Sequence, residues 1–293
     1  MDSAAQRRPR GVLPVGPPGP RHPVRLVALS GDPILHLAGV GVRREGRWIL
    51  DAVEWTVRAG ERWAVVGPNG SGKTTLLRVA STYLWPSRGR VEVLGETIGR
   101  VDARELRRRI GYVSAALMAE IDPALTALDV VVSARQGALA PWWARYGPAD
   151  RARAQDGLAR FGLAGFDART FGSLSTGERS RVLIARTLMT DPELVLLDEP
   201  AAGLDLGARE ALLARLADLA ASELAGLVLV THHLEEIPVG FNRALVLADG
   251  RVRAGGPIEA VLTGPILSDA FGLNLAVDSR AGRFSARATV TAN

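Results

Sequence analysis

The sequence contains no cysteine and only one lysine, Lys73. Without cysteine the chain can form neither disulfides nor thiolate metal sites. The other 35 of its 36 basic residues are arginines, a ratio that indicates the coding bias of a GC-rich genome. Because the chain uses arginine where charge alone is needed, its single lysine marks a position that needs a compact cation with rotatable donors.

Long apolar runs are also absent. No stretch of 18 or more uncharged apolar residues occurs, so we expect no membrane-spanning helix. Arg7, Arg8 and Arg10 are not followed by an apolar run of signal-peptide length, and we expect a cytoplasmic protein. The net charge of +5 is dispersed along the chain, so the charge does not favour a nucleic-acid partner.

Composition and patterning predict one large α/β domain. The 293 residues are 47% hydrophobic, enough for a sizeable core. Residues 1–33 are rich in proline, arginine and glycine, lack periodicity, and are expected to form a disordered tail. Beyond them, buried strands alternate with helices, which predicts a largely parallel sheet. Strands are expected at 62–67, 90–94, 110–114, 194–198, 227–231 and 245–252, the last with a hairpin turn at Asp249-Gly250, and helices at 74–83, 179–190 and 208–221.

The strongest motif is Gly-Pro-Asn-Gly-Ser-Gly-Lys-Thr at 67–74, called here the P-loop. It matches G-x-x-x-x-G-K-[ST] at every fixed position and lies between an expected strand and an expected helix. Its backbone N–H groups and the start of the helix favour a bound phosphate. We expect Lys73 to reach the β- and γ-phosphates and Thr74 to ligate Mg²⁺. The nucleotide contacts expected in this segment are Gly67, Pro68, Asn69, Gly70, Ser71, Gly72, Lys73, Thr74 and Thr75.

A P-loop alone is compatible with small GTPases, kinases, helicases and cassette ATPases. The apolar strand 194–198 narrows the choice because it ends in Asp198 and Glu199. Asp198 is placed to hold Mg²⁺ directly or through water, and Glu199 to polarise the attacking water. An Asp-Glu pair after a strand is also common at turns and helix starts, but the P-loop upstream favours the catalytic interpretation.

The third motif is Leu-Ser-Thr-Gly-Glu at 174–178, called here the signature. With the P-loop and the acidic pair it resembles the ATP-binding cassette family. Gly203-Leu204-Asp205 is similar to the family's D-loop, and His232 is similar to its switch histidine. The resemblance covers about residues 34–264, which leaves 265–293 as a C-terminal tail.

The resemblance implies a P-loop NTPase core, a small antiparallel β subdomain and an α-helical subdomain at about 116–172. It also implies ATP and Mg²⁺ as cofactors, with Glu199 and His232 as catalytic residues. Ser175 and the backbone N–H of Gly177 precede the expected helix 179–190, and a helix N-terminus attracts anions. In the family the signature of one cassette covers the γ-phosphate held by another. Since this chain has one cassette, it needs a second copy or a related subunit.

The sequence departs from the family pattern in three ways. Thr176 and Glu178 replace the commoner Gly and Gln of the signature. The adenine-stacking aromatic aligns with Arg44, whose guanidinium plane can also stack on a base, with Trp48 as a nearby substitute. The Q-loop glutamine, which links the nucleotide to the helical subdomain, aligns with Ala115, so this link is expected to be weakened.

Three functions follow from the resemblance. The first is a transporter subunit, peripheral at the inner face of the membrane, with a separately encoded permease. Its support is the segment 261–273, which resembles the ends of importer ATPases for metal chelates and oxyanions such as molybdate. The second is an ATPase acting on ribosomes or nucleic acid, but the double cassette or coiled coil of such proteins is missing. The third is an orphan homodimer, which Ala115 favours. Trp142 and Trp143 fit either a partner surface or a buried loop anchor.

Overall fold

The computed structural model of the chain describes residues 31–136, 146–222 and 226–289. The expected tail at 1–33 lies almost entirely outside these residues, and so do Trp142 and Trp143. Within the described residues no helix is long and apolar enough to cross a membrane.

The central element is a six-stranded sheet of order β10-β9-β3-β8-β7-β6. Its strands are β3 (Arg62–Val66), β6 (Ile110–Val113), β7 (Leu194–Asp198), β8 (Gly226–Thr231), β9 (Arg243–Ala248) and β10 (Arg251–Pro257). All neighbours are parallel except β9 and β10, which are joined antiparallel by the predicted turn at Asp249-Gly250. Every residue of β3, β7 and β8 is buried, as expected for parallel strands covered on both faces. The predicted α/β fold is confirmed, and the carboxyl ends of β3, β8 and β7 lie side by side.

A smaller antiparallel sheet of order β2-β1-β4-β5 forms the β subdomain. It consists of β1 (Pro33–Arg44), β2 (Arg47–Arg58), β4 (Arg88–Val93) and β5 (Glu96–Thr97). Strand β1 is interrupted by a register shift near Gly39, which has a φ of 60°. Helix α1 (Lys73–Ala80) shares one buried cluster with residues of both sheets, so the P-loop helix is clamped between them.

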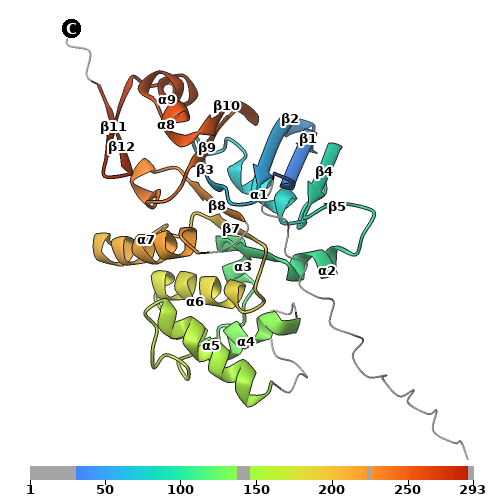
Figure 1. Cartoon of the computed structure of the whole chain (residues 1–293), viewed down its shortest axis with the longest axis vertical. Helices are drawn as coiled ribbons and strands as arrows, with labels where there is room; N and C mark the ends of the chain where they lie inside the picture. The colour runs from blue at the N-terminus through green and yellow to red at the C-terminus, as the bar shows by residue number, and fades with distance from the viewer. Residues whose placement is uncertain (1–30, 137–145, 223–225, 290–293) are drawn as a thin grey trace, which may run out of the picture.

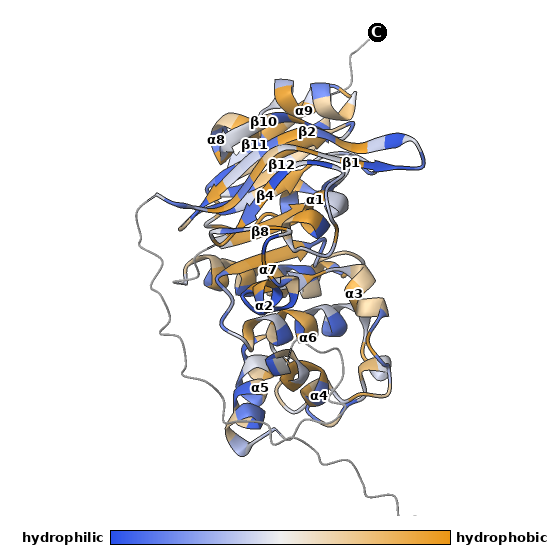
Figure 2. Ribbon diagram, turned by 90° about the vertical axis from the view of Figure 1, so that its right-hand side faces the viewer, coloured by the Kyte–Doolittle hydropathy of each residue, from blue (hydrophilic) through white to orange (hydrophobic). Residues whose placement is uncertain are grey.

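The helices gather on the other face of the central sheet and below it (Figure 1). They are α3 (Ala115–Ala119), α4 (Ala127–Val132), η1 (Ser133–Gln136), α5 (Pro148–Arg160), η2 (Phe171–Ser173), α6 (Thr176–Leu188) and α7 (Leu206–Ala220). Helix α2 (Ala103–Arg108) instead packs through Leu106 into the buried cluster of α1. Helices α4, α5 and α6 pack on one another and form the helical subdomain. Figure 2 shows hydrophobic residues concentrated in the strands of the central sheet, while α5 carries many polar residues.

The C-terminal residues 265–293, expected as a tail, are folded where the structure describes them. Short helices α8 (Ile258–Val261) and α9 (Gly264–Phe271) lead into an antiparallel pair, β11 (Leu275–Arg280) and β12 (Arg283–Ala288), called here the C-terminal hairpin. Its turn contains Gly282 with a φ of 74°, and Phe284 is buried in the main core. Part of the segment named a tail from the sequence thus forms a hairpin that contributes one large apolar side chain to the core.

Candidate functional site

The P-loop runs from the end of β3 into α1, as predicted. Two of its glycines have no room for a side chain. A Cβ at Gly67 would lie 2.0 Å from the backbone oxygen of Leu247, and one at Gly72 would lie 2.8 Å from that of Ile49. Gly72 also has a φ of 101°, a conformation that L side chains rarely adopt. The loop is therefore wedged between β9 and β2, which fixes the direction of its backbone N–H groups.

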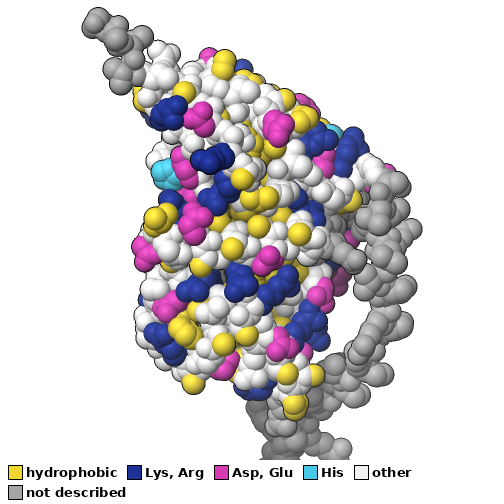
Figure 3. All heavy atoms as spheres, turned by 60° about the vertical axis from the view of Figure 1, so that its left-hand side comes forward, with side chains coloured by type: hydrophobic (Ala, Val, Ile, Leu, Met, Phe, Trp, Pro, Cys, Tyr) yellow, Lys and Arg dark blue, Asp and Glu magenta, His cyan; other side chains and the backbone are white. Residues whose placement is uncertain are grey.

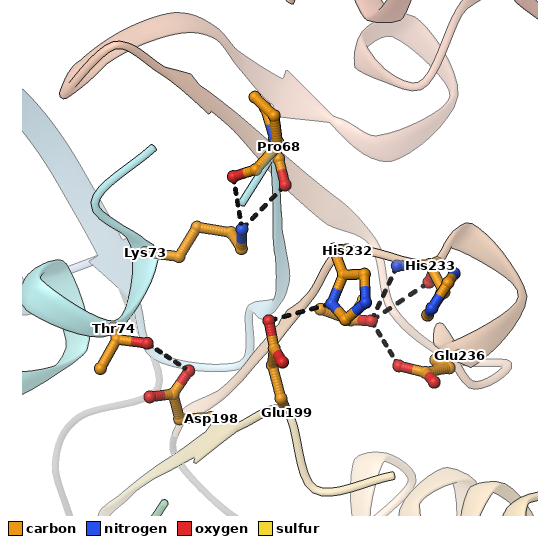
Figure 4. A network of polar contacts seen from close by, with 10 residues as sticks. Pro68, Lys73, Thr74, Asp198, Glu199, His232, His233 and Glu236 are labelled. Atoms are coloured by element: carbon orange, nitrogen blue, oxygen red, sulfur yellow. Dashed lines mark hydrogen bonds and ion pairs between the residues drawn. The ribbon is translucent and has the colours of Figure 1, made fainter. Parts of the chain in front are cut away.

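Lys73 is buried and folded back onto the loop. Its Nζ donates to the carbonyl oxygens of Gly67 at 2.8 Å and Pro68 at 2.9 Å (Figure 4). Burial lowers the pKa of Lys73, while the charges of Glu199 and Asp198 oppose this shift. The Lys73 ammonium now donates to two neutral carbonyls, and its hydrogen bonds to a charged phosphate would be stronger.

The remaining P-loop residues differ in exposure. Asn69 and Gly70 are exposed and Pro68 is half-buried, as is Thr75, which directly follows the loop. The hydroxyl of Ser71 is buried and has no hydrogen-bond partner among the described residues. An unsatisfied buried hydroxyl facing a phosphate loop fits a site that is completed by ligand oxygens.

Asp198 ends β7 beside the P-loop. The hydroxyl of Thr74, an exposed residue, donates to Asp198 Oδ1 at 3.3 Å. Burial raises the pKa of Asp198 to about 6, with Glu199 adding to the shift and Thr74 and Lys73 opposing it. The buried carboxylate thus lacks a cation close enough to restore its ordinary pKa. Among the described residues no three His, Cys, Asp or Glu side chains cluster as a metal site, and the predicted ligands Thr74 and Asp198 lie in hydrogen-bond contact.

Glu199 and His232 come from neighbouring strands. Because β7 pairs with β8, the residue after β7 meets the residue after β8, and His232 Nδ1 lies 3.0 Å from Glu199 Oε1. Glu199 holds a left-handed φ of 49°, and its N–H donates to the oxygen of Val230 at 3.0 Å. Strain of this kind in a carboxylate residue is found at functional sites. Figure 4 shows both side chains on the same side of the P-loop as Thr74 and Asp198.

The signature lies at the start of α6. The helix begins at Thr176, three residues earlier than expected, because Ser175 and Glu178 form a capping box. The Ser175 hydroxyl accepts from Glu178 N at 3.3 Å, and the Glu178 carboxylate accepts from Ser175 N at 2.7 Å. The glutamate that replaces the family's glutamine therefore stabilises the first turn of α6.

Gly177 is packed under the D-loop. A Cβ at this position would lie 2.4 Å from Leu204 Cδ2, so any side chain would displace Leu204. In the described part of the chain no hydrogen bond or ion pair joins Ser175 or Gly177 to residues 67–75. The P-loop and the signature are thus two separate potential anion sites. Sequence reasoning missed the role of Leu204, since no local pattern predicts that contact.

Arg44 and Trp48 lie on the hairpin of β1 and β2. Arg44 is exposed at the end of β1, where it pairs with Arg47. Trp48 is 41% exposed, with the guanidinium of Arg88 4.4 Å from its ring centre and that of Arg43 at 5.9 Å. Since Trp48 already carries stacked guanidinium groups, Arg44 remains the predicted adenine contact.

Ala115 is the first residue of α3 and is exposed. Ser114 caps this helix, its hydroxyl accepting from Leu117 N at 3.2 Å. Position 115 offers no polar side chain at the start of this helix, and the weakened Q-loop link stays a prediction.

A basic cavity of about 300 Å³ lies beside α3, between α2, β6 and the second half of α6. Its lining includes Arg104, Arg107, Arg108 and Arg186 and contains no Asp or Glu. Arg107 is held by Thr82, to whose hydroxyl and carbonyl it donates, and Arg104 and Arg108 make no ion pair with a described residue. No local sequence pattern indicates this site, because its arginines are spread over residues 104–186.

Known proteins resemble this chain over most of its length. Residues 50–202 match the family described as ABC transporter. The uncharacterized ABC transporter ATP-binding protein YlmA of Bacillus subtilis (strain 168) is 43% identical over 242 residues, which cover 81% of this chain and 90% of YlmA. The hemin import ATP-binding protein HmuV of Streptomyces coelicolor (strain ATCC BAA-471 / A3(2) / M145) is 38% identical over 258 residues, covering 87% of this chain and 86% of HmuV.

Solved structures show the same fold. The dimeric ATP-binding cassette MJ0796 in a post-hydrolysis state, bound to ADP and phosphate, superposes with a TM-score of 0.68. It is 28% identical in sequence and covers 76% of this chain and 98% of the cassette.

Proposed function

The chain belongs to the ABC transporter family of ATP-binding proteins, and we propose that two copies bind and hydrolyse ATP to energise a membrane permease. One observation carries the proposal. Lys73, Thr74, Asp198, Glu199 and His232 lie together at the carboxyl ends of three adjacent parallel strands, the edge where α/β sheets bind ligands (Figure 4).

ATP would bind with its phosphates in the P-loop. The ammonium of Lys73 would exchange the carbonyls of Gly67 and Pro68 for the β- and γ-phosphates, and the Ser71 hydroxyl would gain an acceptor. The N-terminal dipole of α1 adds to the attraction. Arg44 would stack on the adenine.

Thr74 and Asp198 would hold Mg²⁺, which when bound neutralises charge on the phosphates. A site with two protein oxygens suits this ion, because Mg²⁺ is usually held by one or two carboxylates together with waters and substrate phosphates. The charge of the ion would favour the ionised form of Asp198 and so oppose the effect of burial on its pKa.

Glu199 would act on the attacking water. Its carboxylate accepts a hydrogen bond from the water, which attacks the γ-phosphorus as the bond to the ADP oxygen breaks. The proton that the water loses passes to a Glu199 carboxylate oxygen. His232, 3.0 Å from Oε1, fixes the direction of that carboxylate.

The second copy would supply the signature. Ser175 is exposed at the N-terminus of α6 and forms no hydrogen bond with the P-loop of its own chain. A head-to-tail dimer would place this helix start against the γ-phosphate of the partner's ATP. The dimeric state of the similar cassette MJ0796 supports this arrangement.

The partner we propose is a separately encoded permease, with this chain at the inner face of the membrane. YlmA and HmuV are both named as transporter ATP-binding proteins, and hemin is a metal chelate, as the C-terminal resemblance suggested. The basic cavity, which Leu117 of α3 helps to line, is the proposed permease contact. The alternative of a ribosome or nucleic-acid partner is not favoured, because Figure 3 shows basic and acidic side chains interspersed on the face it presents.

The test is the substitution Glu199→Gln. We expect ATP binding within about threefold of wild type, turnover reduced more than about 100-fold, and a dimer in size-exclusion chromatography only when ATP is present. Asp218→Asn, on the exposed side of α7, serves as the control and should hydrolyse ATP normally. A Glu199→Gln chain that turns over ATP at the wild-type rate would refute the role of Glu199, and one that binds ATP but stays monomeric would refute the dimer.

A further inference from the structure

The C-terminal hairpin lies against the segment that contains the switch histidine, His232. Residues 231–236, called here the switch segment, end in the short helix η3 (Leu234–Glu236), and β12 packs on it. Figure 1 shows the hairpin on the same side of the molecule as α7, the helix that begins after the D-loop. The hairpin, α7 and η3 therefore meet here, although the hairpin comes much later in the chain than the other two.

Arg283 of β12 joins these elements. Its Nη1 donates to Glu210 Oε2 at 2.9 Å and its Nη2 to Glu210 Oε1 at 3.2 Å, a two-pronged pair with α7. The same Nη2 donates to the backbone oxygen of Glu235 in η3 at 2.7 Å. The bond with Arg283 is the main cause that lowers the pKa of Glu210. One guanidinium thus ties the switch segment to α7, and its planar fork is what makes three such bonds possible.

Two further contacts attach η3 to the hairpin. The N–H of Ala286 donates to Glu235 Oε1 at 3.3 Å, and Phe284 belongs to the same buried cluster as Leu234 and Ile237. A helix of one turn has too few internal hydrogen bonds to hold its own position. The hairpin therefore helps to hold η3 in place, together with the core contacts of Leu234 and Ile237.

On its other side, η3 holds the residues next to the catalytic pair. The Thr231 hydroxyl donates to the buried carboxylate of Glu236 and accepts from His233 N at 3.0 Å (Figure 4). These bonds fix the residues on either side of His232, whose ring Nδ1 contacts Glu199 Oε1. A displacement of η3 would therefore move Thr231 and His233, and with them the imidazole of His232.

We propose that Arg283 is a positioning residue for ATP hydrolysis: by anchoring the switch segment to α7, the C-terminal hairpin sets the distance between His232 and Glu199. This inference rests on the proposed role of His232 in hydrolysis. Arg283 does not touch the nucleotide site, so it affects turnover and not ATP affinity.

The kinetic test compares Arg283→Ala with Arg287→Ala in the full chain. Arg287 is on the same strand but pairs with Asp278 inside the hairpin, so it is a matched control. We expect Arg283→Ala to lower kcat about tenfold with KM within twofold, and Arg287→Ala to leave both within twofold. Arg283→Lys, which keeps the charge but lacks the fork, should recover part of the loss.

A spectroscopic measurement distinguishes positioning from general loss of stability. The sequence contains only four histidines, so histidine-labelled protein gives few imidazole signals, and those of His232 are assigned with His232→Ala. Arg283→Ala and Arg283→Lys should move the His232 signals, whereas Arg287→Ala should not. If either Arg283 variant folds with His232 signals at their wild-type positions, or retains wild-type kcat, the proposal is wrong.

A separate variant, His232→Ala, tests the proposed role of His232 on which this inference rests. If His232→Ala hydrolyses ATP as fast as wild type, the role of His232 is wrong whatever Arg283 does. If His232→Ala is slow and Arg283→Ala is not, the function stands and the positioning role of Arg283 is refuted.

Discussion

Asp198 should make the nucleotide-free protein less stable as the pH rises. Burial raises its pKa from an ordinary value of 3.8 to about 6. Below about pH 4 the carboxyl is protonated in both the folded and the unfolded chain, so it does not lower the free energy of unfolding. Between pH 4 and 6 the unfolded chain loses this proton while the folded chain keeps it, and the folded state is progressively disfavoured. Above pH 6 the penalty is complete, and a shift of about two units corresponds to about 3 kcal/mol.

The substitution Asp198→Asn removes the charge and keeps an oxygen that can accept from Thr74. We expect urea unfolding to give equal stabilities for variant and wild type near pH 4, and a variant more stable by up to about 3 kcal/mol near pH 8. Asp218→Asn is the control, since Asp218 is an exposed residue with only a surface pair, 3.8 Å from Arg215.

The same substitution should remove the Mg²⁺-dependent part of ATP affinity, measured by calorimetry with and without the ion. If the stability difference between Asp198→Asn and wild type were the same at pH 4 and pH 8, the buried carboxylate would not be the unsatisfied group inferred here. Retained Mg²⁺ dependence in the variant would exclude Asp198 as a ligand.

Three further predictions follow from the site. Lys73→Ala should weaken ATP binding more than about tenfold by calorimetry, because it removes a charge-assisted bond worth about 1.5–3 kcal/mol; unchanged affinity would contradict the phosphate role. Gly177→Ala should displace Leu204 and weaken the ATP-dependent dimer in size-exclusion chromatography, and the added change Leu204→Ala should restore it; a double variant as weak as the single would refute the contact. Arg104→Glu with Arg108→Glu should leave basal ATPase activity within twofold and abolish stimulation by a permease in lipid, and stimulation that persists would exclude the basic cavity as the permease contact.

The central sheet and the P-loop edge were predictable because parallel strands are continuous apolar runs. Strands such as β7 and β8 could be located from composition alone, and the residues that follow them must meet at one edge. Asp198, Glu199 and His232 could therefore be placed at this edge from the sequence, whereas the contact of Glu199 with His232 depends on β7 and β8 being neighbours. Their distances and the pKa of Asp198 depend on burial, which the sequence does not specify.

Other features needed tertiary contacts. The start of α6 was open to prediction, since Ser175-x-x-Glu178 has the form of a capping box, yet the helix was placed at 179 from its apolar pattern. The contact of Leu204 with Gly177 has no such signal, and neither has the pairing of Arg283 with Glu210, 73 residues apart. The C-terminal hairpin was missed for the same reason: it is stabilised by what it packs against.

The exposed Ala115 raises the question of how a partner could act on the nucleotide without a glutamine at that position. Helix α6 offers a route that does not need it. Its N-terminus carries Ser175 and its second half contributes Arg186 and Thr187 to the basic cavity, so one rigid element of about 20 Å joins the two sites. Because a straight helix transmits a displacement of one end to the other, a permease segment seated in the cavity would move the signature and the partner's γ-phosphate contact directly. In this chain coupling would therefore depend on the arginines around α6 and would be insensitive to the side chain at 115.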